Sequence, residues 1–247
     1  MIDKPQENFN IPVGPEAVAE TWRARSRLSI SCHGALVWRR GVPIRKIALL
    51  TRVNDKGSHC TSYVLHQTLK IAKRIGVVKE RDWVCFWADG APHYRSTQTI
   101  SNVAIHFSAN ESVNTEHKTG EAYHMKGAVD GYFGELERRL RRAAKRRIIA
   151  TVEGVHTALC VGMGENETIE IFVPTISRSQ WIKEHVPVRG STLPHPIKKT
   201  HVYKFKNKDY RRDSMIGNDK KTVTGITVIS TKLDNICKHS STYLGRV

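Results

Sequence analysis

The stretch from residue 83 to residue 147 constrains this chain more than any other part. An apolar run, Trp83-Val84-Cys85-Phe86-Trp87-Ala88, stops at Asp89-Gly90-Ala91-Pro92-His93-Tyr94-Arg95. Six consecutive apolar residues predict a strand that is buried on both faces, as at the centre of an α/β sheet. Functional groups in such sheets gather at the carboxyl ends of strands, and Asp89 stands at that position.

The other elements up to residue 150 fit an α/β order of strands and helices. Residues 1–20 are polar, contain three prolines, and are expected to form a loop with one short strand near Ile2. Leu65, Leu69, Ala72 and Ile75 share one face of a helix that Thr61 or Ser62 caps and Gly76 stops. The remaining expected elements are strands at 28–38, 44–53 and 103–107, a helix at 91–100, a polar loop at 108–123 and a long helix at 126–150.

The pattern changes after residue 150 to short runs of alternating polar and apolar residues. Such runs occupy 168–173, 201–205 and 223–229, and they predict strands. We therefore expect two domains, a core over residues 1–150 and a smaller β-rich region of unknown role over residues 151–247.

The charge balance narrows the choice of partner. The chain of 247 residues carries 40 Lys and Arg against 23 Asp and Glu, a net charge of +17. This excess favours polyanions, with nucleic acid the first candidate and an anionic membrane surface the second. A protein with a merely basic surface is the alternative. No segment is long and apolar enough to span a membrane, so a membrane is not expected as the partner.

Cysteine usage and the N-terminal residues indicate the compartment. Five cysteines lie far apart, are odd in number and form no C-x-x-C pair, which fits a reducing environment and argues against a structural zinc module. The N-terminus lacks the pattern of a signal peptide. We expect a nuclear or cytosolic protein that is not secreted.

Asp89 and Asp130 are the acids placed for chemistry. A carboxylate directly after six apolar residues is costly to bury unless it binds something, but Asp89 could equally cap the following helix. Asp130, Gly134, Glu137 and Arg141 share one helical face, beside an apolar face that would pack on the sheet. For Asp130 the alternative is a simple balance of the helix dipole.

Residues 138–147 hold seven basic residues in ten. A solvated charged face is the usual explanation of such a run. Phosphate contact and a nuclear-import signal are the alternatives, and the two are compatible. His59, His93 and His124 each lie beside a turn or a strand end, where a histidine acts in acid-base chemistry or is simply exposed.

Two segments resemble the RNase H-like core of eukaryotic transposon-derived proteins. Asp89 to Arg95 is similar to D-G-x-x-x-Q/H-Y/F-K/R, and His124-Met125-Lys126-Gly127-Ala128-Val129-Asp130-Gly131 is similar to H-G-K-G-x-x-D-G. Asn54-Asp55-Lys56-Gly57-Ser58-His59 looks like the S-D-D-x-x-H turn of that core. Glu7-Asn8-Phe9 resembles the tail of its D-F/Y-x-E-N-Y/F segment. The resemblance covers about residues 1–145.

The resemblance implies an RNase H-like fold whose active members hold two divalent metals with three acids. These acids lie on the first strand, on the fourth strand and on the last helix. The second matches Asp89, the third Asp130, and the first Asp3, which is one residue further from Glu7 than in the pattern. Met125 replaces a glycine, and Gly134 stands where the pattern has a glycine pair.

The function that follows is transposase-like or integrase-like cleavage or strand transfer on DNA. Catalytic Asp3, Asp89 and Asp130 would bind Mg²⁺ or Mn²⁺ and run two-metal phosphodiester chemistry. The nucleic-acid contacts would come from His124, Lys126, Arg138, Arg141, Arg142, Lys145 and Arg146. The alternative is a non-catalytic nucleic-acid-binding protein on the same fold, a remnant that binds without cutting. A basic assembly subunit without a polynucleotide partner is a third hypothesis, and a homo-oligomer stays open.

Overall fold

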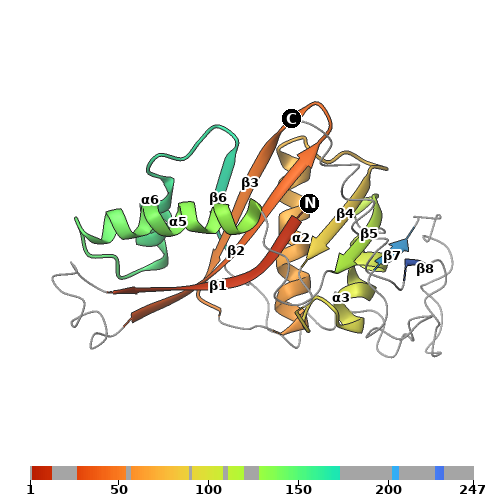
Figure 1. Ribbon diagram of the computed structural model, residues 1–247, viewed down its shortest axis with the longest axis horizontal. Helices are drawn as coiled ribbons and strands as arrows, with labels where there is room; N and C mark the ends of the chain where they lie inside the picture. The colour runs from red at the N-terminus through yellow and green to blue at the C-terminus, as the bar shows by residue number, and fades with distance from the viewer. Residues whose placement is uncertain are drawn as a thin grey trace. The chain divides into compact units, whose positions relative to one another are not determined.

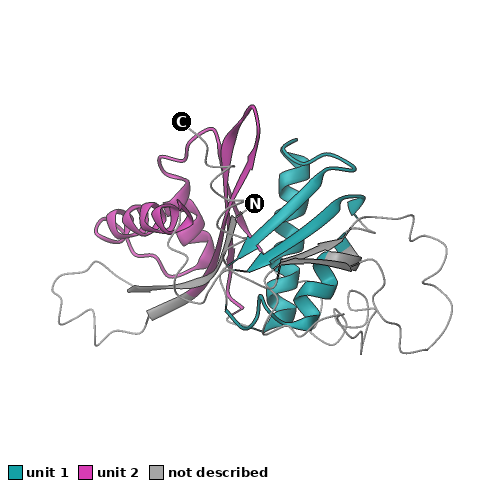
Figure 2. Ribbon diagram, turned by 45° about the vertical axis from the view of Figure 1, so that its right-hand side comes forward, with its two compact units in different colours: residues 1, 57–125, 176–247 teal, residues 2–56, 126–175 magenta. Residues whose placement is uncertain are grey.

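The computed structural model describes residues 2–12, 27–53, 57–88, 91–107, 111–119, 128–172, 202–205 and 226–230. It describes the backbone alone for 2–12, 27–29, 104–106, 202–205 and 226–230. The chain divides into two compact units, coloured separately in Figure 2. Residues 2–56 and 126–175 form one, here the α5 unit. Residues 1, 57–125 and 176–247 form the other, here the β4 unit. The two are described separately below.

A mixed sheet is the framework of the α5 unit (Figure 1). Strands β1 (Ile2–Pro12), β2 (Arg27–Arg39) and β3 (Val42–Thr51) run antiparallel to one another in chain order. Strand β6 (Glu167–Ile171) joins the other edge of β3 in parallel, with Lys46 opposite Glu167. The sheet order in this unit is therefore β6-β3-β2-β1.

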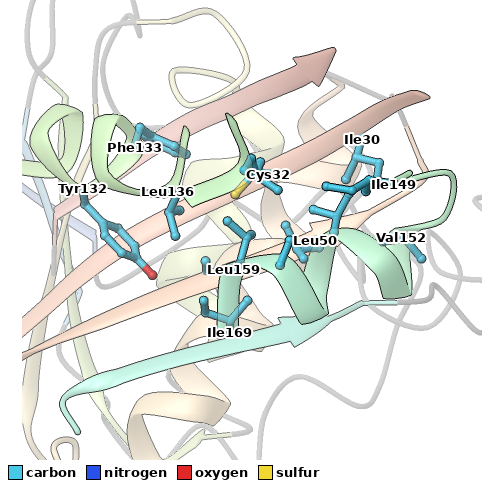
Figure 3. Packing of buried hydrophobic residues seen from close by; sticks show 14 of the residues in the cluster. Ile30, Cys32, Leu50, Tyr132, Phe133, Leu136, Ile149, Val152, Leu159 and Ile169 are labelled. Carbon is cyan, nitrogen blue, oxygen red and sulfur yellow. The ribbon is translucent and has the colours of Figure 1, made fainter. Parts of the chain in front are cut away.

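Two helices of the same unit, α5 (Ala128–Ala144) and α6 (Val152–Cys160), pack on one face of this sheet (Figure 3). Alternate residues of β2, including Ile30, Cys32 and Leu36, face the helices, because successive strand side chains point to opposite faces. The apolar face of α5 supplies the other side of this core, as its spacing predicts, through buried Val129, Phe133, Leu136 and Leu140.

Gly34 sets how closely α5 approaches the sheet. A Cβ atom at this position would lie 2.8 Å from Cζ of Phe133. The Phe133 ring therefore rests directly on the backbone of β2, which only a glycine permits without repacking. Gly34 pairs directly with Lys4 of β1. This pair lies under the turn of α5 that carries Phe133.

The β4 unit contains a parallel strand pair with helices. Helix α2 (Ser58–Arg74) is followed by β4 (Trp83–Ala88), short helix α3 (Thr97–Ser101), π-helix η1 (Asn102–Phe107) and β5 (Asn114–Thr119). Strand β5 pairs in parallel with β4 and antiparallel with β7 (Val202–Phe205), which pairs with β8 (Ile226–Ser230). The α/β fold class and the strand at 83–88 are confirmed. The strand's predicted burial on both faces is wrong, because Val84, Phe86 and Ala88 are buried whereas Trp83 is exposed and Cys85 and Trp87 are half-buried.

The predicted loop at residues 1–20 is wrong over most of its length, because β1 extends over Ile2–Pro12. Its prolines suggested irregular structure, yet Pro5 and Pro12 stand at positions of the strand that proline tolerates. Pro5 falls where the register shifts between Lys4 and Glu7, and Pro12 is the last residue of the strand. Pairing with β2 therefore outweighs the local composition.

Two neighbouring predictions in the β4 unit are also wrong. Residues 103–107 alternate like a strand but form η1, in which Val103 and Phe107, four residues apart, are both buried. The predicted loop at 108–123 contains β5, whose buried positions are polar: Thr115, His117 and Thr119. Hydrophobic periodicity misses such a strand because its inward face carries no apolar side chain.

Several helix ends differ from the predictions. Helix α2 begins at Ser58, because the hydroxyls of Thr61 and Ser62 donate to the carbonyls of Gly57 and Ser58 instead of capping. Gly76 stops the helix as expected, with a φ of 75°. Of the predicted helix at 91–100 only α3 forms, after Ser96 caps it by accepting from the Thr99 amide.

The predicted long helix at 126–150 ends at Ala144, and α6 follows it in place of β-like structure. Thr151 caps α6 by accepting a hydrogen bond of 3.0 Å from the Gly154 amide. The strand predicted at 168–173 is β6, and those predicted at 201–205 and 223–229 correspond to β7 and β8. Within the described ranges, no helix has the length and apolar character that crossing a bilayer requires.

Candidate nucleic-acid interface and acid positions

Two of the three predicted catalytic acids lie on described elements. Asp130 lies in the first turn of α5 and is half-buried. Asp3 lies in β1, of which the backbone alone is described. Asp89 follows Ala88, the last residue of β4, and lies outside the described residues, as do His124 and Lys126. The assembly of a triad therefore stays a prediction.

The register of the sheet bears on Asp3 and Asp130. Lys4 pairs with Gly34, on which Phe133 of α5 rests, whereas Asp3 pairs with Ala35. Adjacent positions along a strand belong to opposite faces, and directly paired positions of antiparallel strands share a face. The register position of Asp3 thus belongs to the sheet face opposite α5, the helix that carries Asp130.

The C-terminal end of α5 concentrates exposed positive charge. Arg138, Arg141 and Arg142 are exposed on the helix, and Lys145 and Arg146 are exposed in the turn that follows Ala144. That turn continues the helical course, because the amides of Lys145 and Arg146 donate to the carbonyls of Arg141 and Ala143. These five residues, here the basic helix end, therefore form one short, regular segment.

Most of these cations form no ion pair with a residue that the structure describes. Arg141 forms an ion pair with Glu137 at 2.8 Å, with both side chains more than half exposed. Among the described residues, none forms an ion pair with Arg138, Arg142, Lys145 or Arg146. Four predicted nucleic-acid contacts are thus open to an external anion.

Arg139 points the other way and belongs to the interior. Its Nη1 atom donates to Oε2 of Glu167 at 2.8 Å and to the carbonyl of Leu159 at 3.1 Å, and its Nη2 atom donates to Glu135. Glu135 also accepts a hydrogen bond of 2.6 Å from Nζ of Lys46 in β3. This charge network (Lys46, Glu135, Arg139 and Glu167) joins α5 to β3 and β6. It neutralises Arg139, one of the seven basic residues at 138–147, within the fold.

The network holds its groups in the charged state. The hydrogen bond from Lys46, aided by Arg139, lowers the pKa of Glu135 despite partial burial. Burial alone would lower the pKa of Arg139, but the hydrogen bonds and charges of Glu167 and Glu135 outweigh it and raise the pKa. Burial and the nearby Glu167 raise the pKa of Tyr132, which therefore stays neutral.

The segment after Asp89 is anchored within the β4 unit. Tyr94 is 1% exposed, and its carbonyl accepts a hydrogen bond of 3.0 Å from Nε2 of His117 in β5. The ring of His93 lies 4.7 Å from that of Tyr94, and the carbonyl of His93 accepts from Oγ1 of Thr99 at 2.7 Å. Burial lowers the pKa of His117 to about 4, so this histidine is neutral at physiological pH.

His59, predicted as a candidate for acid-base chemistry, also has a structural neighbour. Nδ1 of His59 is hydrogen-bonded to the side-chain amide of Gln98, whose Oε1 accepts from Ser58 at 3.0 Å. The start of α2 is thereby joined to α3. This contact gives His59 a positioning role in the fold, and a chemical role for it stays a prediction.

The sequence analysis missed one surface of the α5 unit. Trp38 and Ile44 are exposed where β2 and β3 meet, beside Arg39, Arg40 and Arg45. The signal is present in the sequence, since a tryptophan directly precedes two arginines.

No group of three His, Cys, Asp or Glu residues in the described part of the chain is arranged to hold a metal ion. Asp89 lies outside the described residues, and the side chain of Asp3 is not described, so the Mg²⁺ or Mn²⁺ site stays a prediction.

The described elements define the chain as an α/β protein with a mixed sheet in one unit and a parallel strand pair in the other. Residues 6–209 match the model of a family described as a domain of unknown function, DUF8701, and the chain belongs to this family. Comparison with curated proteins and with solved structures gave no match.

Proposed function

We propose that this chain is a nucleic-acid-binding protein on an RNase H-like core, and that it binds a polynucleotide, DNA first, through the basic helix end. One observation carries this proposal. Arg138, Arg142, Lys145 and Arg146 are exposed together without an ion pair to any described residue. The adjacent Arg139 shows that this fold can neutralise a basic side chain internally, which makes the exposure of its neighbours notable.

The physical basis is electrostatic. Each cation that contacts a backbone phosphate releases condensed counterions, so affinity falls as salt rises, with a slope of about 0.9 per contact on duplex DNA. Residues 138 and 142 are separated by about 6 Å along a helix axis, since each residue rises about 1.5 Å. Such a segment contacts successive phosphates and positions the backbone without recognising the base sequence.

The order of elements supports the RNase H-like part of the proposal. Three antiparallel strands, a helix, and two further strands parallel to each other precede α5. The resemblance implies such a core, with acids on its first strand, its fourth strand and its last helix. The separate β-rich region expected over residues 151–247 stays a prediction, and its first two elements, α6 and β6, pack within the α5 unit.

Charge reversal at the basic helix end tests the binding proposal. We expect the triple variant Arg142→Glu, Lys145→Glu, Arg146→Glu to bind a labelled DNA duplex at least about tenfold more weakly, with a salt slope reduced by about 3. The matched control, Lys70→Glu, Arg74→Glu, Lys79→Glu, makes the same change in net charge on exposed residues of the β4 unit. An equal loss in both variants would show diffuse attraction and refute the assigned interface.

A second candidate function is metal-dependent cleavage or strand transfer by Asp3, Asp89 and Asp130. Its supporting observation is placement: Asp130 opens α5, Asp89 directly follows β4, and Asp3 lies in the first strand. Carboxylates of this kind suit Mg²⁺ or Mn²⁺, which would activate water or a 3′-hydroxyl and stabilise the leaving oxygen. The register position of Asp3, on the face opposite α5, favours binding without cutting.

Calorimetric titration of Mn²⁺, followed by plasmid nicking, separates the two functions. If the chain cuts, Asp89→Asn and Asp130→Asn each abolish saturable Mn²⁺ binding and nicking. Asp82→Asn is the matched control, because Asp82 lies beside the same strand and its carboxylate accepts the Lys79 amide at 2.7 Å. Nicking that survives in both site variants refutes the catalytic assignment and leaves the binding proposal intact.

A further inference from the structure

The connection between β2 and β3 forms an exposed tip, defined here as residues 38–45. Strand pairing continues to Arg39 opposite Val42, so Arg40 and Gly41 make the turn. Gly41 has a φ of 77°, a conformation that other residues rarely adopt. Trp38 is 37% exposed and Ile44 is 56% exposed. Two large apolar side chains are therefore left in water at the end of the hairpin, where the pairing shifts register between Val37 and Arg39.

The tip itself, residues 38–45, carries three arginines and no acidic residue, although exposed Glu165 lies beside Arg45. Residues 27–53 contain six basic residues and no acidic one. Arg40 is exposed, and Arg39 and Arg45 are half-buried. Nη1 of Arg45 donates to the carbonyl of Glu165 at 3.2 Å, an uncharged acceptor that leaves the positive charge of the guanidinium in place. The tip thus combines an accessible indole with guanidinium groups.

The base of the hairpin is firmly held. Lys46 lies opposite Leu36 in the ladder, its amide donates to the carbonyl of Asn166 at 2.8 Å, and its ammonium pairs with Glu135 of α5. A side chain presented by a rigid element loses little freedom when it binds a ligand. Trp38 follows Val37, which is 2% exposed, so its backbone is set by the core of the unit.

We propose that the tip binds unpaired bases of a polynucleotide, with Trp38 stacked on a base and Arg40 on the adjacent phosphate. This inference rests on the proposed function and adds the form of nucleic acid that the protein prefers. A tryptophan face stacks on any base, and guanidinium groups bind phosphates. In a duplex the base faces are covered by neighbouring pairs, so stacking of this kind requires single-stranded or unpaired segments.

Substitution of Trp38 tests the inference. Fluorescence anisotropy would compare a labelled 20-nucleotide oligo-dT strand with a duplex of equal length, using the full chain. We expect Trp38→Ala to weaken single-strand binding about 5- to 50-fold and duplex binding less than about twofold, and Trp38→Phe to restore most of the loss. Trp83→Ala is the matched control, because Trp83 is another exposed tryptophan, in the β4 unit. Circular dichroism melting would show that each variant is folded.

The outcomes distinguish this inference from the function on which it rests. If Trp38→Ala binds both ligands like the wild type, while reversal of the basic helix end still weakens binding, the tip assignment fails and the proposed function stands. An equal loss on single strand and duplex overturns base stacking. If the wild type binds neither ligand at low salt, both proposals fail, and a protein partner becomes the better explanation of the exposed tip.

Discussion

The two compact units use their charged and polar side chains in different ways. In the β4 unit these groups neutralise one another inside the fold. Glu111, 8% exposed, accepts hydrogen bonds from His66 at 2.7 Å and from Lys73 at 3.0 Å. Burial would raise the pKa of Glu111, but these two partners lower it. His117 is enclosed and neutral.

The α5 unit encloses one charge network and leaves further cations at the surface. Arg139 has two carboxylate partners, whereas Arg138 and Arg142, on the same helix, are exposed without an ion pair to a described residue. The comparison teaches that total charge is a poor guide to an interface. The informative quantity is the charge that remains after internal pairing. The end of α5 holds five exposed basic residues between positions 138 and 146, and the β4 unit also has exposed cations, among them Lys70 and Lys79.

The largest expected effect concerns the enclosed network of the α5 unit. Arg139→Met leaves Glu167, whose side chain is 2% exposed, without its cationic partner, and it leaves Glu135 paired with Lys46 alone. Loss of one partner of a buried pair leaves an uncompensated charge, and we expect about 3 kcal/mol of destabilisation. Urea denaturation at pH 7 measures it.

The control for that experiment is Arg138→Met, one position earlier on the exposed face of α5. An exposed substitution of this kind changes stability by less than about 0.5 kcal/mol. Similar losses of unfolding free energy in both variants would mean that Arg139 is no more important for stability than the exposed arginines of this helix.

The next effect is a pH dependence that belongs to the β4 unit. Because burial lowers the pKa of His117 from 6.5 to about 4, the native state binds a proton less readily than the unfolded state. Stability is therefore full above pH 6.5 and decreases as the pH falls toward 4, by about 2 kcal/mol between pH 7 and pH 5. His117→Asn has no imidazole to protonate, so its stability lacks this dependence on pH. The wild type loses stability between pH 7 and pH 5 and the variant does not, so the difference between their unfolding free energies narrows as the pH falls. A constant difference at all pH values would contradict the assigned cause.

The smallest effect concerns the surface ion pair of Glu137 and Arg141. Both side chains are more than half exposed, so Glu137→Gln should change stability by less than about 0.5 kcal/mol. The same variant releases Arg141 and raises DNA affinity at low salt by less than about threefold. Weaker DNA binding in this variant would mean that the basic helix end is not the interface.

The predictions from sequence succeeded where the buried face of an element is apolar. Strand β4 was predicted with its bounds because six apolar residues stand between charged ones. Strand β5 was missed because its buried residues are polar and have carbonyl partners: Thr115 donates to Val103 at 2.9 Å, and His117 donates to Tyr94. Those partners come from other segments, so no local pattern reveals them.

The candidate site shows the same limit. The sequence indicated that residues 138–147 could not all be neutralised internally, and the exposure of six of their seven basic residues agrees with this expectation. It gave no sign that Arg139 turns inward, because its partner Glu167 is 28 positions away, on a strand whose pairing depends on β3. The register that separates Asp3 from the α5 face depends on the irregularity after Lys4, which no composition rule locates.

The pairing of β6 with β3 also has a consequence during synthesis on the ribosome. Arg45 and its carbonyl partner at Glu165 are 120 positions apart. At about 5 to 20 residues per second, the outer edge of β3 would stay open for roughly 6 to 24 seconds before β6 emerges. An open strand edge invites pairing with other nascent chains. Arg45 and Lys46 lie along that edge, and mutual repulsion between their charges on neighbouring chains would discourage such pairing until the correct strand arrives.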